Sequence, residues 1–180
     1  MNSKTSKVLA MFLTLCLLLS LAAPAFAAGN QIIIGTKEEL LTFAQNCTLD
    51  SWSQGKTVRL TADIDLAGTS FQAIPTFGGT FDGGGHTISG VTIQKKWPGN
   101  YGLFGYVTGA IQNVTVTGTI YNRSGEPHSA VGGIVGDLAG GVVRNCAADL
   151  VIDSNRRSLG FFAGGIVGLL EKGGLVQNCR

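Results

Sequence analysis

The sequence predicts an all-β protein, a right-handed parallel β-helix with a short helix that covers its N-terminal end. Two observations lead to this prediction. Of the 180 residues, 27 are glycine and only 13% are charged, and frequent glycine among β-branched residues is typical of short strands joined by tight corners. In addition, the second half of the chain repeats with a period of about 32 residues, which is the mark of a stacked architecture.

The first 27 residues are organised like a secretory signal peptide. Lys4 and Lys7 precede a largely apolar stretch, residues 8–19, and the small residues of Ala25-Phe26-Ala27 follow a proline. The apolar stretch is shorter than the roughly 18 residues of a spanning helix. We therefore expect cleavage after Ala27, a mature chain without a membrane span, and a secreted, extracellular or cell-surface location.

The charge of the mature chain argues against two classes of partner. Removing residues 1–27 leaves 13 − 2 = 11 basic residues against 11 acidic ones. A nucleic-acid-binding protein is expected to carry a basic stripe, and a peripheral membrane protein a basic amphipathic face; neither is visible. With His86 and His128 as the two histidines and no His-Glu-x-x-His motif, we also expect no metal site and no cofactor.

Residues 28–50 are predicted to form an N-terminal cap. Thr36 and Glu39 have the spacing of a capping box at the start of a helix, and Leu40, Leu41 and Phe43 supply an apolar face behind it. Such a helix would cover the open end of a stacked core, where apolar columns and strand edges are otherwise exposed.

Residues 51–180 are predicted to form the rungs of the stack. A repeat of this length, made of short strands, cannot bury its own apolar face and must stack on a copy of itself. In the alternating segment 114–117 the two valines are expected to face inward and the two threonines outward. The recurring blocks are Gly102–Gly105, Gly133–Gly136 and Gly165–Gly168, at spacings of 31 and 32, and the blocks containing Asn113, Asn145 and Asn178, at spacings of 32 and 33.

The three aligned asparagines allow two interpretations. Their amides could bind a ligand along a groove. Alternatively, they close a corner of each rung, because asparagine tolerates left-handed backbone angles and stacked asparagines form ladders. We favour the structural role for Asn113, Asn145 and Asn178.

The cysteines follow the same columns. Cys146 and Cys179 stand where the preceding repeat has Val114, which predicts a small, apolar and buried position. Stacked on each other, the two residues would lie within the Cα distance that a disulfide accepts, and export permits oxidation. A bridge and a pair of free thiols both remain open. Cys47 is left over, so the mature cysteines do not form a disulfide framework.

The segments "LTADIDL" at residues 60–66 and "GTFDGGGHTISGVTI" at residues 79–93, together with the "GLFG / GGIVG … NC" repeats, resemble bacterial surface proteins that carry the GLUG motif. These proteins belong to the pectin-lyase-like group of right-handed parallel β-helices, and the resemblance covers roughly residues 32–180. It implies a non-catalytic scaffold, stalk or adhesin, with extracellular glycans or host proteins as partners.

The repeat pattern continues to Arg180, directly after an Asn-Cys block. A bare last rung would expose its apolar columns and its strand edges. We therefore expect further C-terminal domains in a longer protein, or another chain that covers this end.

An enzyme of the same fold, a polysaccharide lyase or glycosidase, is the alternative. Its weak catalytic candidates are Asp63, Asp65 and Asp82, since glycoside hydrolysis needs two carboxylates that flank the bond. Asp-x-Asp beside turns and Asp before glycines more often satisfy local backbone donors, so we favour a chain without catalytic residues. Trp52 and Trp97 are weak candidates for glycan contact, and either could equally pack against the cap or the base of a loop.

Overall fold

The computed structural model describes residues 30–95, 99–122, 129–154 and 161–180. Of these residues 52% are strand and 10% are helix, so the chain is all-β. Two compact units are distinguished, Met1–Asn30 and Gln31–Arg180, and the fold below is that of the second unit. The signal peptide expected at residues 1–27 lies outside the described residues.

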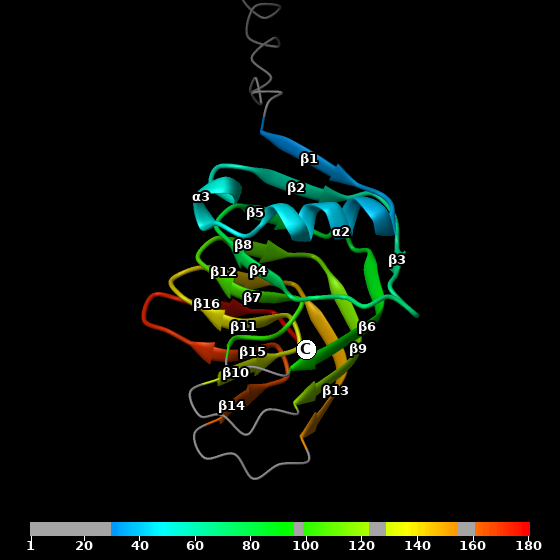
Figure 1. The fold of residues 1–180 in the computed structure, drawn as a ribbon. Helices are drawn as coiled ribbons and strands as arrows, with labels where there is room; N and C mark the ends of the chain where they lie inside the picture. Colours follow the sequence, from blue (N-terminus) through cyan, green and yellow to red (C-terminus); the bar gives the residue numbers. More distant parts are fainter. Residues whose placement is uncertain (1–29, 96–98, 123–128, 155–160) are drawn as a thin grey trace, which may run out of the picture. The chain divides into compact units, whose positions relative to one another are not determined.

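The described part of the chain contains two short helices and sixteen strands (Figure 1). The helices are α2 (Lys37–Asn46) and α3 (Asp50–Ser53). The strands are β1 (Gln31–Ile34), β2 (Thr57–Leu60), β3 (Ile64–Asp65), β4 (Ile74–Phe77), β5 (Thr80–Asp82), β6 (Thr87–Lys95), β7 (Phe104–Val107), β8 (Ala110–Gln112), β9 (Thr115–Asn122), β10 (Ser129–Gly132), β11 (Val135–Leu138), β12 (Val142–Arg144), β13 (Ala147–Ser154), β14 (Phe161–Gly164), β15 (Val167–Leu170) and β16 (Leu175–Gln177).

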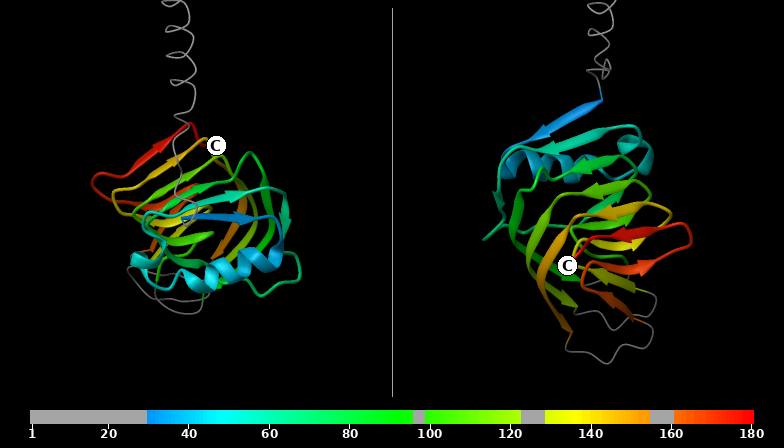
Figure 2. Two further views of the ribbon diagram at one scale, coloured as in Figure 1. Left: turned by 90° about the horizontal axis from the view of Figure 1, so that it is seen from above. Right: turned by 180° about the vertical axis from the view of Figure 1, so that it is seen from behind.

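These strands form four sheets in which every pairing is parallel. The largest sheet has the order β1-β2-β5-β8-β12-β16, two four-stranded sheets have the orders β15-β11-β7-β4 and β13-β9-β6-β3, and a two-stranded sheet joins β10 to β14. From β7 onward, neighbouring strands in a sheet therefore come from successive repeats of the sequence. Figure 2 shows this order from behind, from the blue β1 to the red C-terminal strand.

The strand register matches the sequence period. Val143 pairs with Ile111 on one side and with Val176 on the other, and Val135 pairs likewise with Phe104 and Val167. Each residue thus lies beside its counterpart one repeat away, at the roughly 4.8 Å distance between paired strands. The spacing found in the sequence is therefore the spacing between adjacent strands.

The inward side chains form one apolar core between the sheets. Val114 and Val116 are buried, as expected from the alternation in their segment. Near the N-terminal end the core is aromatic: the ring centroids of Phe77 and Phe104 lie 5.4 Å apart, and those of Phe81 and Phe104 lie 5.2 Å apart in an edge-on arrangement. Such contacts add to the stabilisation that comes from burial.

The cap begins with the expected capping box. The Thr36 hydroxyl accepts a hydrogen bond from the Glu39 backbone N–H (3.2 Å), and the Glu39 carboxylate accepts one from the Thr36 N–H (3.1 Å). Leu40 and Phe43 of α2 are buried in the core. The region assigned to the cap also contains β1, which pairs with β2 and so belongs to the largest sheet.

The aromatic core generates a stability prediction. Phe81→Ala removes a fully buried ring and should lower the free energy of unfolding by about 3–5 kcal/mol. Phe162→Ala is the matched control, because that ring is 47% exposed and its loss should cost much less. Urea denaturation of both variants checks the prediction, and equal losses would contradict the assigned core.

Candidate functional site

The three aligned asparagines form a ladder at one corner of the stack. All three adopt left-handed backbone angles, with φ of 56° at Asn113, 54° at Asn145 and 52° at Asn178. The Nδ2 of Asn145 donates to Oδ1 of Asn113, and the Nδ2 of Asn178 donates to Oδ1 of Asn145, both at 3.3 Å. The amides of Asn145 and Asn178 are thus each joined to the amide one repeat before.

Asp82 begins the ladder. Its Oδ1 accepts hydrogen bonds from Asn113 Nδ2 at 2.9 Å and from the Gly84 N–H at 3.0 Å. Partial burial acts to raise the pKa of this carboxyl, but the hydrogen bonds and the nearby charge of Arg59 outweigh burial and lower the pKa below its ordinary value. Asp82 is therefore ionised at neutral pH and its Oδ1 is engaged within the protein.

Asp63 binds the other end of the turn that joins β5 to β6. Its Oδ1 accepts a hydrogen bond from the Thr87 N–H at 2.9 Å and lies 3.2 Å from Nδ1 of His86. The backbone hydrogen bond, followed by the interaction with His86, lowers the pKa of Asp63. The carboxylate is exposed to solvent.

Asp65 serves a different turn. Its Oδ1 accepts a hydrogen bond from the Ala67 N–H at 2.9 Å and lies 3.4 Å from the Ser89 hydroxyl. The three candidate acids thus have no hydrogen-bond partner in common, and each stabilises backbone N–H groups where strands end. This is the role that aspartate commonly plays in turns.

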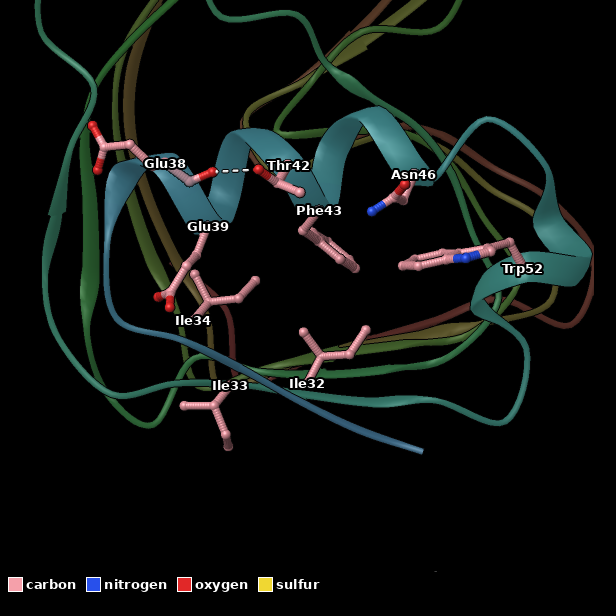
Figure 3. Close-up of a pocket in the computed structure, with 9 residues that line it drawn as sticks. All are labelled: Ile32, Ile33, Ile34, Glu38, Glu39, Thr42, Phe43, Asn46 and Trp52. Carbon is pink, nitrogen blue, oxygen red and sulfur yellow. Dashed lines mark hydrogen bonds between the residues drawn. The ribbon is translucent and has the colours of Figure 1, made fainter. Parts of the chain in front are cut away.

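An apolar cavity of about 330 Å³ opens at the N-terminal end of the core, between β1 and α2 (Figure 3). Ile32 and Ile34 point into it from β1, and Phe43 and Trp52 face them. Polar groups at its rim come from Glu38, Glu39, Thr42 and Asn46. Apolar walls with a few polar groups are typical of small-ligand sites.

Trp52 packs within this end of the core while it lines the cavity. Its ring lies 6.1 Å from the ring of Phe43, and Nζ of Lys56 lies 4.8 Å from its centroid. Trp52 thus packs against Phe43 and also lines the cavity. Trp97 lies outside the described residues.

The cysteines of the described chain are free thiols. Cys146 is buried, as expected from its place in the Val114 column. The Cys146 thiol donates to the carbonyl of Arg144 (3.1 Å), and the Cys179 thiol donates to that of Gln177 (3.2 Å). Burial raises the pKa of Cys146 to about 11 and that of Cys47 to about 12.

Asp137 is an acidic residue that the sequence predicts as surface charge, and the structure contradicts that prediction. Its side chain is buried; Oδ2 accepts a hydrogen bond from Asn100 Nδ2 at 3.0 Å, and Oδ1 has no partner among the described residues. Burial, together with the charge of Glu171, raises the pKa of this carboxyl. Asp137 pairs with the half-buried Tyr106, and all four residues of β11 are buried, so no alternation distinguishes it.

The geometry defines the chain as an all-β protein of parallel sheets with polar residues stacked at its corners. No family model matches the sequence, and no solved structure matches it. The chain is similar to halomucin from Haloquadratum walsbyi, with 31% identity over 139 residues. The similarity covers 67% of this chain and 1% of halomucin.

Two further properties concern the described residues alone. Neither α2 nor α3 has the length and hydropathy that a membrane span requires. Within the same residues, no three His, Cys, Asp or Glu side chains gather as they would around a metal ion.

The left-handed backbone at the asparagine positions predicts that a glycine variant is more stable there than an alanine variant, the reverse of the order within a strand. At Asn145 either change removes the ladder amide, but alanine also pays about 1–2 kcal/mol for a left-handed backbone. Glycine has a more flexible unfolded state, which costs about 0.4–1 kcal/mol. Asn145→Gly should therefore be the more stable variant by about 0.5–1 kcal/mol.

Thr117 in β9 is the matched control, because its backbone is not left-handed. There the alanine variant should be more stable than the glycine variant. Chemical denaturation of the four proteins measures both differences, and the same order at both sites would rule out a backbone role for the asparagine.

The burial of the Cys47 and Cys146 thiols predicts that both react slowly with thiol reagents. In the folded protein Cys47 and Cys146 should react slowly with a disulfide reagent at pH 8, because the thiolate is the reactive form and the pKa values are about 12 and about 11. Both should react rapidly in denaturant. Fast labelling of either residue in the native state, located by mass spectrometry, would contradict the assigned burial.

Proposed function

We propose that residues 31–180 form a right-handed parallel β-helix of the GLUG-motif group that acts as a non-catalytic scaffold, stalk or adhesive segment outside the cell. The observation that carries the proposal is the hydrogen bonding of the polar residues. The asparagines bond to one another along the stack, and Asp63, Asp65 and Asp82 each accept backbone hydrogen bonds. The asparagine side chains therefore stabilise the stacking of successive rungs, and the aspartate side chains stabilise the turns.

The enzyme alternative needs a different arrangement. A glycosidase of the usual kind holds one protonated and one ionised carboxyl on either side of a bond. Asp63 and Asp82 both have pKa values below the ordinary value, so neither is suited to donate a proton at neutral pH. Oδ1 of Asp63 and Oδ1 of Asp82 are in addition both engaged by backbone N–H groups of one turn.

A location outside the cell is supported by the leader-like residues 1–27. The similarity to a stretch amounting to 1% of halomucin supports a role as one segment of an extended protein. Glycans and host proteins are the proposed partners, and the cavity beside Trp52 is the proposed glycan contact. Its aromatic ring and polar rim supply the stacking surface and hydrogen-bonding groups that sugar recognition uses.

The proposal is tested by a glycan array and by a polysaccharide-cleavage screen of the secreted chain. No polymer should release product. If glycans bind, Trp52→Ala should weaken binding at least tenfold, whereas Trp97→Ala tests the second candidate separately. Product release that is lost in Asp82→Asn would establish the enzyme alternative instead.

A further inference from the structure

A second cavity lies beside the loop that joins β3 to β4, residues 66–73. Its volume is about 380 Å³, which is within the range of small-ligand sites. Residues of the loop and of β6 line it together with Tyr101. We call this space the polar cavity, and the lining residues that could contact a ligand are Thr69, Ser70, Gln72, Thr92, Gln94 and Tyr101.

The polar cavity arises because two neighbouring rungs differ in length. The two-residue β3 pairs with β6 at Ile88 and Ser89, and from there β6 continues to Lys95 beside β9 alone. The chains are still in contact at Gly90, where a Cβ would lie 2.5 Å from the backbone nitrogen of Ala67. After β3 the chain turns away from the stack before it returns to β4 (Figure 1). Both walls of the cavity thus belong to described residues of this chain.

The loop that forms one wall is held in place. Leu66 and Phe71 are buried in the core. The Leu66 carbonyl accepts a hydrogen bond from the Thr69 N–H at 3.0 Å, and the Thr69 carbonyl accepts one from the Phe71 N–H at 2.9 Å. A wall that is fixed before a ligand arrives loses little conformational freedom on binding.

The polar side chains of the cavity differ from the corner residues described above, whose polar groups bond to the protein. The Thr92 hydroxyl lies 3.5 Å from a backbone carbonyl within β6. The other hydroxyl and amide side chains of the lining have no hydrogen-bond partner among the described residues: Thr69, Ser70, Gln72 and Gln94. Their hydrogen-bonding capacity is therefore free for water or for a ligand.

The residue types of the lining define the chemistry of that ligand. No lining residue is charged, so the cavity offers neither a countercharge for a phosphate nor the carboxylates that a divalent cation prefers. Each hydroxyl can donate and accept, and each amide offers two donors and an acceptor. Such a set matches a ligand whose own groups both donate and accept, as the hydroxyls of a sugar do.

Tyr101 supplies an aromatic surface beside these groups. Its side chain is half-buried, and its backbone is fixed on both sides: the N–H donates to the Ala130 carbonyl at 2.8 Å, and the carbonyl accepts from the Gly132 N–H at 2.9 Å. The C–H face of a sugar ring can pack on such a ring while its hydroxyls bond to the amides.

We propose that the polar cavity binds a neutral carbohydrate, one or two sugar units of a glycan, through the amides of Gln72 and Gln94 and the ring of Tyr101. Tyr121 pairs with Gln94 in the next rung and places a further aromatic residue beside the site. The proposal extends the proposed function, because it adds a second contact for glycan partners, and it does not depend on the cavity beside Trp52.

The test begins with the secreted chain on an array of neutral, sulfated and uronic-acid glycans. Neutral glycans should bind in preference to charged ones. The affinity for the best neutral glycan, measured by calorimetry, should change less than about twofold between low and high salt, because no charged group takes part. Failure of every neutral glycan to bind, or a preference for charged glycans, would overturn the proposal.

Two glutamine variants locate the bound glycan. Gln72→Ala and Gln94→Ala change exposed side chains, so the stability of the chain should stay the same. Each variant should weaken binding about five- to tenfold, the loss of one or two hydrogen bonds. Gln177→Ala is the matched control, because it removes an exposed glutamine of β16 that lies outside the polar cavity, and its affinity should be unchanged.

The Trp52→Ala variant separates the two candidate contacts. Binding that is lost in this variant but survives both Gln72→Ala and Gln94→Ala would overturn the polar cavity and leave the Trp52 contact in place. The opposite pattern would support the polar cavity and reject Trp52. Release of product from a polysaccharide would contradict the non-catalytic role, whereas the effect of the glutamine variants on binding tests the cavity separately.

Discussion

In-register parallel stacking is the constraint on which the rest of this structure depends. A residue that lies about 4.8 Å from its counterpart in the next rung must be compatible with that counterpart in size and in hydrogen bonding. Inside the stack the column Phe81, Ile111, Val143 and Val176 meets this condition with apolar side chains. At the corner, asparagine meets it with an amide that both donates and accepts.

Much of the fold could be predicted because residues that stack on one another recur in the sequence at a regular spacing. The spacing of the glycine and asparagine blocks is the strand register, and the alternation around Val114 correctly indicates the buried face. The capping box at Thr36 and Glu39 could likewise be predicted, because it depends on four consecutive residues and on no tertiary contact. The structural role predicted for Asn113, Asn145 and Asn178 likewise depends on a local property, the tolerance of asparagine for left-handed backbone angles.

Contacts outside the repeat could not be predicted. The short β1 precedes the first recognisable rung, so its pairing with β2 and the cavity behind it leave no periodic signal. Asp137 is a charged residue that would be expected at the surface, yet it is buried and accepts a hydrogen bond from Asn100, 37 residues away. Asp63, Asp65 and Asp82 were recognisable as turn residues, but the partner of each carboxylate depends on which rung lies beside it.

The direction of the hydrogen bonds between rungs has a mechanical consequence. These bonds run along the stacking direction, and in the described residues the chain passes along this direction from β1 to β16. A pulling force applied at the two ends of this segment therefore opens the bonds of one rung at a time instead of shearing a whole sheet at once. Each released rung of the glycine and asparagine repeat frees about 32 residues, roughly 100 Å of extended chain, so a segment built in this way lengthens in steps under load.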